Sequence, residues 1–151
     1  MSDRLVKSLR AKFPMYPPHP GYSALQIMHT YGSARNALLY AALFVPELIE
    51  IDGSVFLNTG EPDFAADMKR GVAKWNKPRE ELEELVSMAE VHYLFTDRRV
   101  DAEETDLLTE FIAQAWRGQL ALQFPGRKFR VWIDPEEISG DVPVVRFCEI
   151  R

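Results

Sequence analysis

The sequence has few of the residues that build a disulfide framework or a membrane span. Cys148 is its single cysteine, which excludes an internal disulfide and any zinc site made of paired cysteines. The longest apolar run, residues 37–45, is about half of the ~20 residues that cross a bilayer. Charged residues at Arg4, Lys7 and Arg10 interrupt the apolar pattern of a signal peptide. We therefore expect a cytoplasmic protein with no membrane partner.

Motifs of catalysis and cofactor binding are also missing. The three histidines lie in three different segments without a His-x-x-x-His pair, and neither a Gly-x-Ser-x-Gly elbow nor a phosphate-binding glycine loop occurs. The acidic segment 97–104 lacks the central glycine of a calcium loop. Cys148 falls in a predicted strand, where we expect a small core residue rather than a nucleophile. The sequence thus favours a binding protein over an enzyme, with no metal and no cofactor.

Length and composition predict one soluble domain over residues 1–151. The chain has 46% hydrophobic and 27% charged residues, which is typical of a globular protein with a sizeable core. The segment 13–21 contains four prolines and is expected to be an extended connector, or alternatively a recognition strip.

Strand patterns come in pairs and helix patterns lie between them. Asp52-Gly53 predicts a two-residue hairpin turn that pairs Ile49 with Phe56 and Leu48 with Leu57. A second pair of strands is expected at 129–133 and 144–150, where apolar residues alternate. Helical spacing predicts helices near 5–12, from Tyr22 or Ser33 to 45, and over 62–75, 80–96 and 101–124.

These patterns predict an α+β fold in the order α-α-β-β-α-α-α-β-β. The two hairpins are expected to join into one antiparallel sheet with helices packed on it. The helix that ends at Pro46 is apolar on all sides, which predicts a central position in the fold.

Negative charge is concentrated in the middle of the chain. The net charge is −5, whereas residues 61–110 hold 14 acids and 7 bases and therefore carry −7. A partner attracted by charge should be basic, although acidic residues that merely solvate surface helices would give the same pattern. The one stretch in which bases alternate with aromatic residues, 127–132, is a lone basic strand, so we expect no nucleic-acid partner.

Our first hypothesis is a protein-binding module that uses this acidic region to bind a basic protein. Bacterial immunity proteins, which inhibit basic toxins, are an analogy in size, acidity and α+β character, and no motif carries the comparison. The most charged segment supplies the candidate partner-binding residues, which are Asp97, Arg98, Arg99, Asp101, Glu103, Glu104 and Asp106. A helix–helix turn with internal ion pairs is the alternative interpretation of this segment.

Our second hypothesis is a small enzyme or ligand-binding domain. Its pocket would use the groups suited to proton transfer near neutral pH, which are Tyr16, His19, His29 and His92. His92 lies on the apolar side of its predicted helix, where a hydrogen-bonded core histidine is the competing interpretation. A homo-oligomer formed through an edge strand at 144–150 is compatible with the sequence.

Overall fold

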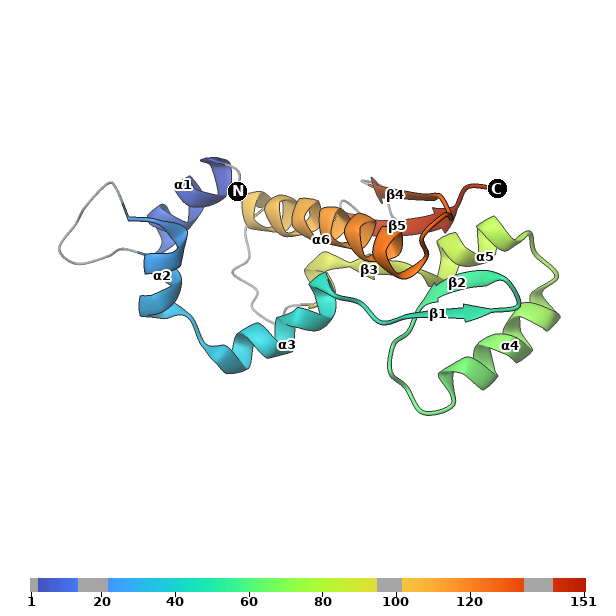
Figure 1. Cartoon of the computed structure of the whole chain (residues 1–151). Helices are drawn as coiled ribbons and strands as arrows, with labels where there is room; N and C mark the ends of the chain where they lie inside the picture. Colours follow the sequence, from blue (N-terminus) through green and yellow to red (C-terminus); the bar gives the residue numbers. More distant parts are fainter. Residues whose placement is uncertain (1–2, 14–21, 95–101, 135–142) are drawn as a thin grey trace. The chain divides into compact units, whose positions relative to one another are not determined.

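The computed structural model describes residues 3–13, 22–94, 102–134 and 143–151, without the side chains of Asp3, His92 and Tyr93 (Figure 1). Its contacts group the chain into two compact units, Met1–Ala41 and Ala42–Arg151. The single domain expected from the length stays a prediction. The α+β class is confirmed, and the elements follow the expected order broadly.

The N-terminal unit consists of short helices. Helix α1 (Asp3–Lys12) ends just before the proline-rich segment, as predicted, and packs against α2 (Ala24–Tyr31). A capping box begins α2, because Ser23 Oγ accepts from the Gln26 amide at 3.3 Å and Gln26 Oε1 accepts from the Ser23 amide at 2.8 Å. Gly32 separates α2 from α3 (Ala34–Phe44), so the apolar helix begins after Ser33, the second of its two predicted starts, and α2 is an additional helix.

The central position predicted for the apolar helix is wrong. Helix α3 has no buried residue, and its side chains are exposed from Ala34 to Ala42. The physical reason is that the packing within the N-terminal unit lies between α1 and α2, while the sheets belong to residues 42–151.

The first hairpin has the register predicted from the sequence. Strands β1 (Leu48–Ile51) and β2 (Ser54–Leu57) pair Leu48 with Leu57 and Ile49 with Phe56. Its turn residues, Asp52 and Gly53, both have a positive φ, of 51° and 82°, as a primed two-residue turn requires. Helix α4 (Phe64–Trp75) contacts β1, and α5 (Arg79–Val86) contacts β2. Together they enclose a small core of Ile51, Phe56, Met68 and Leu82.

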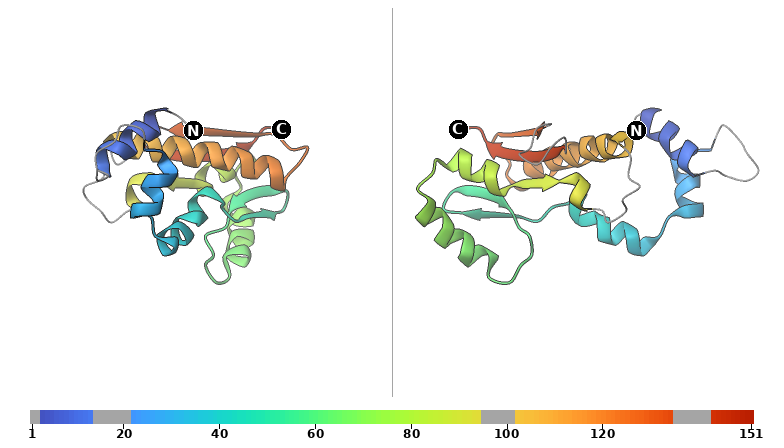
Figure 2. Two further views of the ribbon diagram at one scale, coloured as in Figure 1. Left: turned by 60° about the vertical axis from the view of Figure 1, so that its left-hand side comes forward. Right: turned by 180° about the vertical axis from the view of Figure 1, so that it is seen from behind.

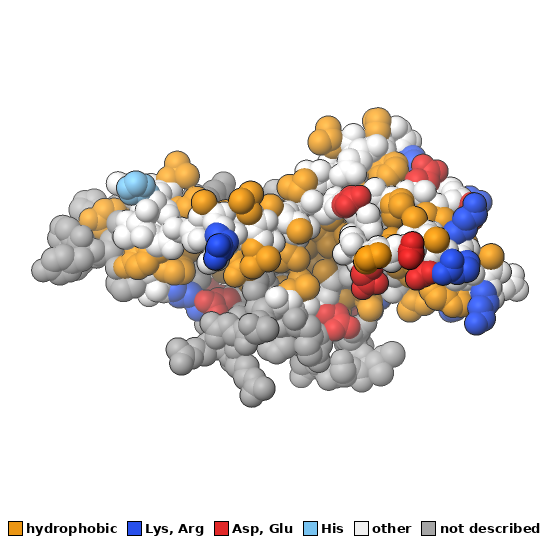
Figure 3. Space-filling view, turned by 90° about the horizontal axis from the view of Figure 1, so that it is seen from below, with side chains coloured by type: hydrophobic (Ala, Val, Ile, Leu, Met, Phe, Trp, Pro, Cys, Tyr) orange, Lys and Arg blue, Asp and Glu red, His pale blue; other side chains and the backbone are white. Residues whose placement is uncertain are grey.

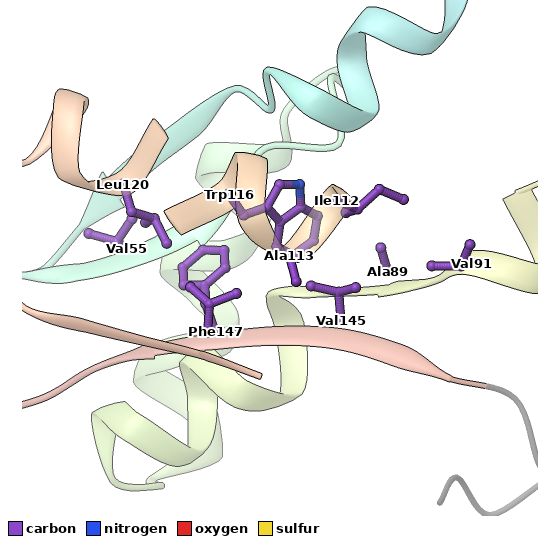
Figure 4. Packing of buried hydrophobic residues seen from close by; sticks show 10 residues of the cluster. Val55, Ala89, Val91, Ile112, Ala113, Trp116, Leu120, Val145 and Phe147 are labelled. Carbon is purple, nitrogen blue, oxygen red and sulfur yellow. The ribbon is translucent and has the colours of Figure 1, made fainter. Parts of the chain in front are cut away.

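The main core lies between α6 (Ala102–Gln123) and a three-stranded antiparallel sheet (Figure 2). The sheet has the order β3 (Met88–Glu90), β5 (Val144–Glu149), β4 (Phe129–Asp134), and a short 3-10 helix, η1 (Val91–Leu94), follows β3. Trp116 of α6 packs its ring edge-on against Phe147 of β5, with 5.8 Å between the ring centres (Figure 4). Val145, Ile112 and Leu120 complete the same cluster.

Two details of the predicted architecture differ from the structure. The two hairpins form separate sheets in the described residues, and β3 pairs with β5 along the edge that β4 leaves open. Strand β3 itself replaces the last part of the helix predicted over 80–96. Strand β5 is therefore the centre of its sheet and not the edge strand suggested for oligomerisation.

Candidate functional site

Helix α6 is fixed to the sheet along one side. Thr105, Thr109, Ile112, Trp116 and Leu120 recur every three or four residues and are all buried. The Trp116 indole also donates a hydrogen bond of 2.8 Å from Nε1 to the carbonyl oxygen of Leu43. Because large aromatic side chains dominate packing energies, this anchoring makes α6 a rigid support for the residues on its opposite side.

The opposite side of α6 begins with an acidic row. Glu103, Asp106 and Glu110 are exposed and follow each other by three and four residues, so they lie on one face of the first three turns. Glu104 lies next to this row and is half-buried. Carboxylates at a helix N-terminus are stabilised by the helix dipole, and they offer oxygen acceptors to Lys and Arg side chains. The row is therefore chemically suited to bind a cationic protein surface.

Three of the seven predicted partner-binding residues belong to this part of α6. Glu103, Glu104 and Asp106 lie within one turn of each other at its start. The other four, Asp97, Arg98, Arg99 and Asp101, lie outside the described residues. The structure adds Glu110, which ends the acidic region in the sequence and follows Glu103 by seven residues.

The residues of the alternative pocket are not shown to converge. Tyr16 and His19 lie outside the described residues, and only the backbone of His92, in η1, is described. His29 is exposed in the last turn of α2. The N-terminal unit does contain a pocket of about 170 Å³, but its lining is apolar apart from Tyr31 and does not include His29. The lining residues are Leu9, Phe13, Ala24, Ile27, Met28, Tyr31 and Gly32.

Cys148 is a buried residue of β5, which confirms its predicted place in the core. Burial raises the pKa of its thiol to about 11, and the nearby carboxylate of Glu84 adds to the shift. At neutral pH the group is therefore a thiol and not the thiolate that nucleophilic chemistry requires.

A buried carboxylate, Glu83, joins three parts of the larger unit and was not recognised in the sequence. Its side chain is fully buried, although the sequence pattern predicts only a favourable charge at a helix start. Glu83 Oε1 accepts from the Val55 amide at 3.0 Å and from Arg151 Nη2 at 2.8 Å, and Oε2 accepts from the Glu149 amide at 2.8 Å. These bonds connect α5 to β2, to β5 and to the C-terminal residue.

A second ion pair lies beside Glu83. Arg127 binds Glu149 with two parallel hydrogen bonds, of 2.8 Å from Nε and 2.6 Å from Nη2, and also donates to the Gly53 carbonyl at 3.0 Å. The guanidinium group of Arg127 holds the pKa of the Glu149 carboxyl below its usual range, against the opposing effect of burial. The pKa of Arg127 is raised by the same contact. The charged side chains of this cluster, which are Glu83, Arg127, Glu149 and Arg151, pair with one another. We therefore assign the cluster to stability rather than to binding.

Comparisons with protein-family models, curated proteins and solved structures find no match to this chain. Within residues 3–13, 22–94, 102–134 and 143–151, no group of three His, Cys, Asp or Glu side chains is placed to hold a metal ion. The helices described here include none long and apolar enough to span a membrane.

Proposed function

We propose that this chain is a small acidic cytoplasmic protein that binds a basic protein partner through the start of α6. The observation that carries the proposal is the exposed acidic row of Glu103, Asp106 and Glu110 on a helix whose other side is fixed in the core. A rigid helix presents these carboxylates without the entropic cost of ordering a loop, which favours specific binding. An immunity-type inhibitor that masks a basic toxin is the kind of protein that fits this description.

Charge supports the same proposal at longer range. Residues 42–151 contain 22 acids and 13 bases, a net charge of −9. Such a field accelerates encounter with a cationic partner and makes the association sensitive to salt. The single cysteine, which is free and buried, supports a reducing compartment such as the cytoplasm.

Affinity capture with charge-reversed variants tests the proposal. The tagged full chain is incubated with native lysate, and the retained proteins are quantified by mass spectrometry at low and at high salt. We expect one basic protein to be retained by the wild type and released as salt rises. Its recovery should fall about tenfold for Glu103→Lys/Asp106→Lys, because opposite charges across the contact become like charges.

A control with the same change in net charge separates this surface from a general charge effect. Glu47→Lys/Glu61→Lys reverses two exposed acids that lie outside α6. It should retain the partner to within about twofold of the wild type. Equal losses for both variants would assign the binding to net charge alone, and equal recovery of the partner by all three proteins would exclude the α6 surface.

A further inference from the structure

The two helices α2 and α3 expose an unusual amount of apolar surface within the N-terminal unit. Leu25 and Met28 of α2 are 74% and 63% exposed, and Leu38 and Leu39 of α3 are 78% and 67% exposed. Figure 3 shows hydrophobic side chains gathered over this part of the chain. Single exposed leucines need no explanation, but two consecutive helices that each expose large apolar side chains indicate a binding surface.

The charge of this unit differs in sign from that of the rest of the molecule. Residues 4–46 contain five Lys and Arg residues and no Asp or Glu, in a chain that has 23 acids. Helix α1 exposes Arg4, Lys7 and Arg10, which follow each other by three residues. The whole unit, residues 1–41, has five bases and one acid and carries +4. A surface that is both apolar and free of acids is complementary to an anionic, partly apolar one.

We propose that the N-terminal unit binds the surface of an anionic lipid bilayer. The exposed leucines and Met28 would enter the boundary between headgroups and acyl chains, and the bases of α1 would lie against lipid phosphates. Helix α3 has eleven residues, so at 1.5 Å per residue it is roughly half as long as the ~30 Å hydrocarbon layer is thick. It is suited to lie in the interface and not to span it.

A bilayer fits this surface better than a second copy of the chain does. A symmetric dimer through α2 and α3 would bring two units of +4 together, and neither copy has an acid between residues 4 and 46 to face the bases of the other. This proposal replaces the expectation, drawn from the sequence, that no membrane is involved.

Vesicle co-sedimentation of the full chain tests the proposal. The probes are vesicles of phosphatidylcholine alone and of phosphatidylcholine with phosphatidylserine in a three-to-one ratio. We expect binding to the anionic vesicles and at least tenfold weaker binding to the neutral ones or at high salt. Lys7→Gln/Lys12→Gln should weaken binding to anionic vesicles roughly 25-fold, since each base near the surface contributes about a factor of five.

The apolar contribution is tested with two matched double variants. Leu38→Ser/Leu39→Ser removes two exposed leucines of α3 and should weaken vesicle binding at least tenfold. Leu85→Ser/Leu122→Ser removes two exposed leucines of the other unit, which are 49% and 73% exposed. This variant should leave vesicle binding unchanged. Circular dichroism of both variants checks that the fold is kept, as expected for exposed positions.

Three results would overturn the proposal. The first is a wild type that does not sediment with anionic vesicles, and the second is equal binding to neutral and anionic ones. The third is equal loss of vesicle binding in both leucine variants. If vesicles are not bound and light scattering instead finds a dimer that Leu38→Ser/Leu39→Ser dissociates, a second copy of the chain covers this surface.

Discussion

Glu83 joins several separate parts of residues 42–151 through hydrogen bonds of its side chain. It is an acceptor for two backbone amides and for Arg151, and it has no access to solvent that could replace these bonds. A buried donor that loses its acceptor costs about 1–3 kcal/mol, so the three bonds are linked in their effect on folding.

Substitution of Glu83 should therefore destabilise the protein strongly. We expect Glu83→Ala to lower the free energy of unfolding by about 3–5 kcal/mol, because it leaves two backbone amides without their acceptor and removes one of the two carboxylates that pair with Arg151. Glu83→Gln keeps one acceptor oxygen and should lose less. Urea unfolding followed by tryptophan fluorescence measures both, and Glu80→Ala, at an exposed position of the same helix, should stay within about 0.5 kcal/mol of the wild type. A similarly small effect of Glu83→Ala would contradict the role of this residue.

The Glu149–Arg127 pair should make stability depend on acid pH. The pKa of Glu149 is lowered in the folded state, so its contribution is present above its ordinary value of about 4.3 and is lost as pH falls through the folded value. We expect Glu149→Gln to be roughly 1–3 kcal/mol less stable than the wild type at pH 7, with the difference shrinking toward pH 3. Thermal unfolding at several pH values measures this.

Glu50 provides the control for that measurement. Its carboxylate lies 3.3 Å from Arg127 but is half exposed, so Glu50→Gln should cost less than about 1 kcal/mol. If the stability difference between wild type and Glu149→Gln is the same at pH 3 as at pH 7, the assigned protonation of Glu149 is wrong.

The sequence contains part of the information that identifies Glu83. Leu82 and Val86 mark the apolar side of α5, and Glu83 lies about 60° beyond Val86 around the helix, so the pattern places its carboxylate at the margin of the buried side. The partners were not visible, because Val55, Glu149 and Arg151 come from distant positions that only the fold brings together.

At the scale of elements, the turn of the first hairpin combines a left-handed backbone conformation at Gly53 with a side chain packed close to it. Gly53 has a φ of +82°, and a Cβ atom added there would lie 2.8 Å from Arg79 Nη1. Gly60 has a similar φ of +74°, but no heavy atom would lie within 4 Å of an added Cβ. The two glycines therefore separate the cost of backbone conformation from the cost of a steric clash.

We expect Gly60→Ala to destabilise by about 1 kcal/mol, which is the backbone cost of the left-handed region. Gly53→Ala should cost more than Gly60→Ala, because the Arg79 side chain must also move. Chemical denaturation of both variants measures the difference. Equal losses would show that Arg79 gives way freely and that the backbone alone requires glycine at this turn.

Local signals predicted some elements well and others poorly, for identifiable reasons. Asp52-Gly53 determines its turn type by itself, so the hairpin and its register followed from the sequence. The helical pattern of residues 80–96 ends early because distant bonds compete with it. Ser87 Oγ accepts from the Leu57 amide and the Ser87 carbonyl accepts from the Phe147 amide, and β3 begins at the next residue.

At the scale of the whole molecule, charge and apolar surface divide between the two units. Residues 1–41 carry +4 and expose leucines, whereas residues 42–151 carry −9 and present the acidic row of α6. Counting charge over residues 61–110 located the acidic region in the sequence, but the unit boundary after Ala41 is a property of the fold. Each unit thus has its own proposed partner, and the substitutions made in one proposed surface leave the other surface unchanged in sequence.

The most direct test of the central claim measures the rate at which the captured basic partner associates with the purified chain. Surface plasmon resonance compares the wild type, Glu103→Lys/Asp106→Lys and Glu47→Lys/Glu61→Lys over a range of salt concentrations. The acidic row of α6 predicts an association rate about tenfold lower for the first variant at low salt, a smaller change for the second, and convergence of all three as salt rises. An association rate that is the same for all three proteins at low salt would contradict the account.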